Sequence, residues 1–170
     1  MAEQQVICSK NIEIEGQIAF GQGSVIHPDC SIIAESAPIV FGEYNIIEER
    51  VRIINRKPEE NPAPLPLQIG SYNIFEVGTI IEYSEIGNYN VFEHRCKVEP
   101  NCKIGNGCII TAGVRVARGT TIPDLTVVYG EGQMRKNQGM QEDSFRHEIK
   151  ALTEVLAKCL GSQAIQASHK

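Results

Sequence analysis

The sequence predicts an all-β solenoid, a single-stranded parallel β-helix of hexapeptide repeats with about six coils, followed by one α-helix. Three observations predict it. An aliphatic or aromatic residue recurs at every sixth position, a longer motif recurs about every eighteen residues, and the spacing becomes helical after residue 137. A period of six fits neither an amphipathic helix nor the simple alternation of a strand.

The sixfold series predicts which side chains fill the interior. A smaller residue often stands two positions earlier, as a tight corner beside a packed core requires, and four of the six cysteines occupy that position. The 19 inward positions are Cys8, Ile14, Phe20, Ile26, Ile32, Phe41, Ile47, Ile53, Ile69, Phe75, Ile81, Ile86, Phe92, Val98, Ile104, Ile110, Val116, Ile122 and Val128.

The longer motif sets the register of the coils. It reads Gly-x-Tyr-Asn-aliphatic-(Ile/Phe)-Glu and starts at Gly42, Gly70 and Gly87, with a weaker copy at Gly105, so the spacings are 28, 17 and 18. Three hexads make a triangular coil of 18 residues, and coils bonded as β-strands stack at about 4.8 Å. The predicted core columns are Ile69, Ile86, Ile104 and Ile122; Phe75, Phe92, Ile110 and Val128; and Ile81, Val98 and Val116.

The spacing of 28 contains one coil and ten further residues. The surplus falls in 56–67, a segment with four prolines. Proline lacks the N–H that a ladder needs, so this segment is predicted to be an extruded loop of the β-helical unit 1–136. A passive insertion or a partner-binding arm is favoured over a substrate lid, because no catalytic cluster lies at its base.

The C-terminal region predicts one amphipathic helix within 137–161. Asp143 or Ser144 can cap its start, and Gly161 suits its end. The helix is expected to pack its apolar stripe on a flat side of the solenoid, and the patternless tail 162–170 is expected to be mobile. The stripe consists of Phe145, Ile149, Leu152, Val155, Leu156, Cys159 and Leu160.

Composition narrows the function classes. The net charge is −5 in 170 residues, which argues against a nucleic-acid partner. No apolar run reaches the roughly 20 residues that span a bilayer, and the start lacks a secretory h-region, so a cytosolic protein without direct membrane insertion is expected. The cysteines form no Cys-x-x-Cys or tight Cys/His cluster, which favours reduced, packed thiols.

Three segments carry a family resemblance: 39–49, 69–78 and the closing Thr-Val-Val-Tyr-Gly of 126–130. Over roughly residues 19–135 the chain resembles the dynactin subunit 6 family. The resemblance implies a left-handed β-helix in the pointed-end complex of dynactin, pairing with dynactin subunit 5 and other pointed-end subunits in a hetero-oligomer. It further implies a non-catalytic adaptor role in dynein-driven microtubule transport, in the cytoplasm and on the cytoskeleton. The tail contains no Ser-Pro or Thr-Pro, so no proline-directed phosphorylation switch is expected.

The competing interpretation is an enzyme, because many hexapeptide proteins are acyltransferases or γ-class carbonic anhydrases. A γ-class zinc site needs three histidines, whereas the coil region contains only His27 and His94, both expected to face solvent. His94 keeps some claim as an acyltransferase base, which would require a coenzyme A groove and a trimer. His147 on the helix and His169 in the tail have no partner in the pattern. No catalytic residue, metal or cofactor is predicted.

The motif also places two ladders on the outer wall. Glu48, Glu76 and Glu93 repeat at equivalent positions, where stacked like charges are unfavourable unless something neutralises them. They are either merely solvated or dock a basic partner surface. Tyr44, Tyr72 and Tyr89 form a second ladder, typical of local packing and also of protein interfaces. The open ends of a β-helix, with unpaired strand edges, independently argue for a partner.

Overall fold

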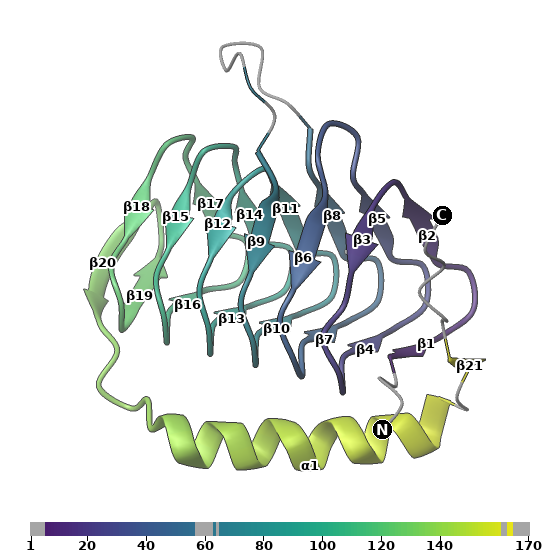
Figure 1. Cartoon of the computed structure of the whole chain (residues 1–170). Coiled ribbons are helices and arrows are strands. Elements are labelled where there is room, and N and C mark those ends of the chain that lie inside the picture. The colour runs from purple at the N-terminus through teal and green to yellow at the C-terminus, as the bar shows by residue number, and fades with distance from the viewer. Residues whose placement is uncertain (1–5, 57–62, 64, 161–162, 165–170) are drawn as a thin grey trace.

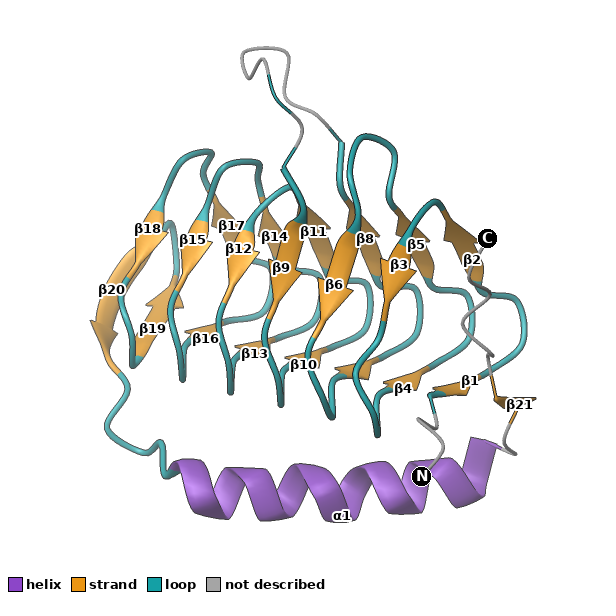
Figure 2. Cartoon of the chain, in the orientation of Figure 1, coloured by secondary structure: helices purple, strands orange, loops and turns teal. Residues whose placement is uncertain are grey.

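The chain forms a triangular prism of stacked coils with one long helix lying along it, as the computed structural model in Figure 1 shows. The structure describes residues 6–56, 63, 65–160 and 163–164. Each coil contributes one short strand to each of three sheets, so Figure 2 shows strands separated by regular turns on all three sides. Among the described residues no helix is both long and apolar enough to cross a membrane.

The three sheets are made almost entirely of two- and three-residue strands. Sheet A contains β1 (Ile7–Cys8), β4 (Val25–Ile26), β7 (Ile46–Ile47), β10 (Ile74–Phe75), β13 (Val91–Phe92), β16 (Ile109–Ile110), β19 (Thr126–Tyr129), β20 (Gln133–Lys136) and β21 (Gln163–Ala164). Sheet B contains β2 (Glu13–Glu15), β5 (Ser31–Ile33), β8 (Arg52–Ile54), β11 (Ile80–Glu82), β14 (Lys97–Val98) and β17 (Arg115–Val116). Sheet C contains β3 (Ile18–Ala19), β6 (Ile39–Phe41), β9 (Leu67–Ile69), β12 (Glu85–Ile86), β15 (Lys103–Ile104) and β18 (Thr121–Ile122).

The predicted solenoid is confirmed, and its strands pair in parallel in the predicted register. Ile86 lies between Ile69 and Ile104 in sheet C, and Ile104 pairs onward with Ile122. The same stacking joins the Phe75 column in sheet A and the Ile81 column in sheet B. All eleven of these side chains are buried, which places the hydrophobic core on the prism axis.

Buried asparagines explain the Asn of the repeated motif. Asn45, Asn73 and Asn90 are fully buried just before strands of sheet A. Each side-chain oxygen accepts the backbone N–H of the next coil, at 3.0 Å from Asn73 to Asn45, 2.9 Å from Asn90 to Asn73 and 2.7 Å from Cys108 to Asn90. Buried polar groups are stable when bonded in this way, so the column fixes the corner without any metal or disulfide.

The first coil departs from the prediction that every sixth residue is buried. Ile14 is 36% exposed, and Phe20 is only half-buried. The expectation is wrong for Ile14 because it lies on β2, the edge strand of sheet B, which no other described strand covers on its outer side. Phe20 still stacks on Phe41 with ring centroids 4.8 Å apart.

The predicted loop 56–67 begins after β8 and ends at β9, where Leu67 already belongs to the strand. Residues 57–62 and 64 lie outside the described residues. Asn55 ties the base together, since its side-chain amide donates to the carbonyl oxygens of Ala37, Pro38 and Leu65. This fully buried side chain anchors both ends of the insertion to the neighbouring coil.

The helix α1 (Glu142–Leu160) runs along the prism beside sheet A. It begins one residue before Asp143 and two before Ser144, the two predicted caps, because the amide of Phe145 already donates to the carbonyl of Gln141.

Two further strands were not predicted. β20 pairs antiparallel with β19, and β21 pairs antiparallel with β1. β21 lies within the tail 162–170 that the sequence predicts to be mobile. Gly161 and the rest of the tail lie outside the described residues.

Candidate interaction surfaces

The tyrosine ladder, Tyr44, Tyr72 and Tyr89, is a continuous stack of rings along the corner between sheets C and A. Neighbouring ring centroids lie 5.3 and 5.4 Å apart, with planes within 17° of each other. This spacing is favourable for aromatic pairs and follows from the distance between coils. Each tyrosine has a left-handed backbone with φ between 52° and 60°. The repeat itself therefore builds the ladder.

Two cations of α1 lie over the ladder. The guanidinium carbon of Arg146 is 5.6 Å from the Tyr72 ring centroid and 5.7 Å from that of Tyr89. Its Nη2 also donates to the Tyr89 hydroxyl at 2.6 Å. The Lys150 ammonium is 5.0 Å from the Tyr44 centroid. Cations over aromatic faces are attracted by the ring quadrupole, so the ladder is the docking platform for the chain's own helix.

Fewer apolar residues of α1 contact the solenoid than the predicted stripe contains. Ile149 and Thr153 are buried, and Phe145 packs edge-on against the last ring of the ladder. Leu152 is 40% exposed and Val155 is 55% exposed. Cys159 is exposed as well. The prediction that the whole stripe faces the solenoid is wrong for these three residues, because the flat wall contacts a single helical face.

The glutamate ladder, Glu48, Glu76 and Glu93, lies on a different corner, between sheets A and B. Its carboxylates are half-buried, and each accepts a backbone N–H from the next coil: Val77 donates to Glu48 at 3.1 Å, His94 to Glu76 at 3.1 Å, and Ala112 to Glu93 at 2.9 Å. Burial raises the pKa of the Glu48 carboxyl. The ladder is thus bonded into the corners rather than freely solvated, and its role in docking a basic partner stays a prediction.

The three histidines that the structure describes lie on two different coils and on α1. His94 is exposed and its Nδ1 lies 2.6 Å from the Glu76 carboxylate. His27 has a side chain only 12% exposed, and its Nδ1 lies 3.2 Å from Glu49. The expectation that His27 faces solvent is wrong because the neighbouring coil covers the ring. The ring of His147 contacts a backbone carbonyl of its own helix.

The described residues include no group of three or more His, Cys, Asp or Glu side chains placed to hold a metal ion. His169 lies outside the described residues. All six cysteines are free thiols, and all but Cys159 are buried. Burial raises the pKa of Cys8 and of Cys96 to about 12, and that of Cys30 to about 11. These thiols stay protonated and unreactive near neutral pH.

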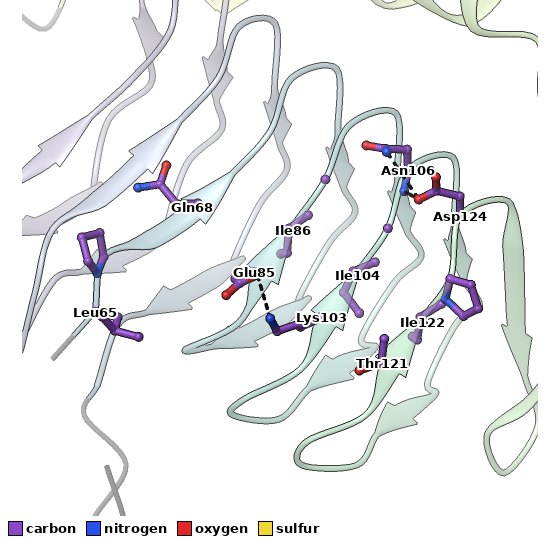
Figure 3. A pocket seen from close by; sticks show the side chains of 14 residues that line it. Leu65, Gln68, Glu85, Ile86, Lys103, Ile104, Asn106, Thr121, Ile122 and Asp124 are labelled. Atoms are coloured by element: carbon purple, nitrogen blue, oxygen red, sulfur yellow. Dashed lines mark hydrogen bonds and ion pairs between the residues drawn. The ribbon is translucent and has the colours of Figure 1, made fainter. Parts of the chain in front are cut away.

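An open groove of about 600 Å³ lies on the outer wall of sheet C, beside the base of the loop (Figure 3). Leu65, 53% exposed, stands on one side, and strands β12, β15 and β18 form the floor. The floor carries an ion pair between Glu85 and Lys103 at 3.5 Å. At its far end the backbone N–H of Asn106 donates to the Asp124 carboxylate at 2.7 Å.

Comparison with known proteins gives matches to part of the repeat and to most of the chain. The family described as "Bacterial transferase hexapeptide (six repeats)" matches residues 83–130. Dynactin subunit 6 of Nematostella vectensis is 37% identical over 156 residues, which cover 89% of this chain and 84% of the relative. Dynactin subunit 6 of Danio rerio is also 37% identical, over 81% of this chain and 73% of the relative. The chain belongs to the dynactin subunit 6 family.

Solved structures that resemble this member of the dynactin subunit 6 family include hexapeptide transferases. A Bacillus cereus protein assigned as an acetyltransferase superposes with a TM-score of 0.60 and 14% identity, over 94% of this chain and 91% of that one. At that identity the likeness concerns the fold alone. The left-handed parallel β-helix implied by the family resemblance is confirmed.

The sequence did not predict the contacts of two side chains of α1, Arg146 and Lys150. Their spacing was a usable indication, because the two cations are four residues apart and lie near Ile149 on one helical face. What the sequence lacked was the position of the helix, without which no tyrosine could be assigned to it. The tyrosine and glutamate ladders lie on different corners of the prism, so they form two surfaces rather than one.

Proposed function

We propose that this chain is a non-catalytic, structural subunit of dynactin that supports dynein-driven microtubule transport through protein–protein contacts. The observation that carries the proposal is the similarity to dynactin subunit 6, which extends over 89% of the chain and 84% of the relative. A cytoplasmic, cytoskeleton-associated location follows from membership of that complex.

The placement of the chemical groups supports a non-catalytic role. His94, paired with Glu76, lies on the corner between sheets A and B. The groove lies on the outer wall of sheet C, whereas that corner joins the other two sheets. A general base must come within hydrogen-bond reach of the bound substrate, and within one chain these two features do not converge.

Acyl transfer is the alternative, and the exposed His94–Glu76 pair at 2.6 Å is the observation that favours it. A carboxylate beside an imidazole can orient the ring and stabilise its protonated form. An enzyme of this kind would bind coenzyme A and lose activity with His94→Ala. In the structural subunit the same substitution leaves dynactin assembly unchanged.

We also propose that the chain pairs with dynactin subunit 5 within the pointed-end complex, as a hetero-oligomer. In the described part of the chain, the end strands of sheets B and C have no partner on their outer edges, which supports the need for a partner because exposed edges otherwise invite aggregation.

Co-expression with dynactin subunit 5, followed by size-exclusion chromatography, tests both parts of the proposal. A one-to-one complex is expected, together with recovery of dynactin by a tagged copy of the chain from cells. A stable homotrimer that binds coenzyme A and does not recover dynactin would contradict the proposal.

A further inference from the structure

The two ends of the solenoid differ in how well they cover the core. At the C-terminal end the inward residues Val116, Ile122 and Val128 are at most 3% exposed. At the N-terminal end Ile14 is 36% exposed, and Phe20 is only partly buried against the core. The N-terminal end therefore presents apolar side chains that a further coil would cover.

Among the residues that the structure describes, the same end carries two strand edges with no further strand paired to them. β2 is the outermost strand of sheet B and β3 that of sheet C, while β21 covers the outer edge of β1 in sheet A. The amide of Glu13 donates to Cys30, and the carbonyl of Glu15 accepts from Ala34, so both residues bond inward to the next coil. Backbone groups alternate in direction along a strand, so those of Ile14 point toward the open side.

The arrangement of the edges indicates what can occupy them. β2 and β3 belong to one coil and meet at a sharp corner, where Gly16 has φ of +82°. A single extended peptide can pair with one of these edges but cannot follow the other around the corner. A coil of another parallel β-solenoid whose third side leaves room for β21 can pair with both and cover Ile14 and Phe20 in the same step.

We propose that the N-terminal end of the solenoid, β2 and β3 with Ile14 and Phe20, docks the end coil of a second, different parallel β-solenoid. Glu13 and Glu15 flank Ile14 on the outer wall, so the docking strand carries basic side chains beside an inward aliphatic residue. The inference rests on the proposed function, because it assigns the surface through which this subunit meets its neighbour.

A second copy of this chain fits the site poorly. Its own β17 and β18 are the terminal strands of sheets B and C, and Arg115 would come opposite Glu13. However, β20 lies outside β19 and β21 lies outside β1, so two additional strands would separate the copies along sheet A. At about 4.8 Å per strand, sheets B and C could not then come within pairing distance.

The test compares tagged full-length chains expressed in cells and recovered with their associated proteins. Ile14→Arg and Glu15→Lys place positive charge at the proposed surface, and Thr121→Arg on β18 places the same charge at the opposite end. Recovery of dynactin is expected to fall at least tenfold for the first two variants and to stay within twofold of wild type for Thr121→Arg. Circular dichroism of the purified chains checks that each variant keeps its fold.

Hydrogen–deuterium exchange on the unmodified chain provides the second readout. The peptide spanning residues 11–22 is expected to exchange at least tenfold more slowly in assembled dynactin than in the isolated chain. If the chain assembles but this peptide stays unprotected and Ile14→Arg binds normally, the docking surface is wrong while the proposed function stands. If wild type recovers no dynactin, the proposed function itself fails. A homodimer that Ile14→Arg disrupts would show that a second copy is the occupant, and would overturn the inference.

Discussion

At the scale of single residues, the left-handed corner before each strand of sheet A determines which side chains the motif can use. The stacked residues of this corner have φ between 52° and 70°, a region that costs most L-amino acids about 1–2 kcal/mol. They are Gly23, Tyr44, Tyr72, Tyr89, Gly107 and Leu125. Tyrosine is tolerated there because its ring stacks on the ring of a neighbouring tyrosine, and Tyr72 has such a neighbour on both sides.

Gly23 is required at this corner because of its left-handed backbone and because of the nearby Tyr44 ring. Comparing two substitutions separates these two reasons. An added Cβ would meet the Tyr44 ring at 2.4 Å, on a backbone with φ of +70°. We expect Gly23→Ala to lower the free energy of unfolding by about 2–4 kcal/mol, through backbone strain and displacement of the ring. Urea unfolding followed by circular dichroism measures the loss.

The matched control for Gly23 is Gly113, which has the same φ of +70° and nothing within 4 Å of an added Cβ. Gly113→Ala should cost only the backbone strain, about 1 kcal/mol. Equal losses for the two variants would show that the Tyr44 ring gives way freely.

Glu48 predicts a pH dependence of stability. Burial raises the pKa of its carboxyl in the folded chain above the unfolded value, so the folded state binds the proton more tightly. The stability that the protonated carboxyl contributes is therefore fully present below the unfolded pKa and is lost as pH rises through the folded pKa. Glu48→Gln avoids this loss and is expected to be at least as stable as wild type at pH 7, with the difference shrinking at mildly acidic pH. Thermal unfolding from pH 4 to 8 measures it, and a variant less stable at every pH would contradict the assignment.

At the scale of elements, the docking of α1 depends on one narrow face. Ile149→Ala removes a side chain that is 1% exposed and should weaken docking by about 2–4 kcal/mol. Because each coil of a solenoid depends mainly on its neighbours, the prism should stay folded while residues 142–160 exchange faster with deuterium.

The control for Ile149 lies on the same helix. Leu152 is 40% exposed, so Leu152→Ala is expected to change the exchange of α1 little, by about 0.5 kcal/mol or less. Equal effects of the two substitutions would mean that the outer face of the helix contributes to docking as much as the inner one.

At the scale of the whole molecule, the glutamate ladder could act as a partner interface, and its hydrogen bonds decide how to test this. Charge reversal would also break the bonds to the corner amides, so a loss of assembly could reflect a damaged fold. Replacing Glu48, Glu76 and Glu93 together by glutamine removes the charges and keeps an acceptor oxygen. If the ladder docks a basic surface, dynactin recovery should fall about tenfold and depend less on salt. Unchanged recovery would assign the ladder to the fold alone.

The sequence alone determined the prism, its three core columns and the coil-to-coil register, because a six-residue repeat leaves one arrangement that buries its aliphatic series. The same regularity placed both ladders on the outer wall. The repeat could not predict the structure at the two ends of the solenoid, where the period ends. The exposure of Ile14 and the capping strands β20 and β21 depend on what lies beyond the last coil, and so were decided by the tertiary structure.

The position of α1 was also beyond the sequence, since its apolar stripe fits more than one flat wall. Only the tertiary structure selected the tyrosine ladder, where Arg146 and Lys150 meet the faces of stacked rings. The physical reason is the same in each case. Contacts between coils follow the repeat and can be predicted from its period. Contacts of the helix and the tail with the prism join residues far apart in sequence, and no period predicts which residues pair.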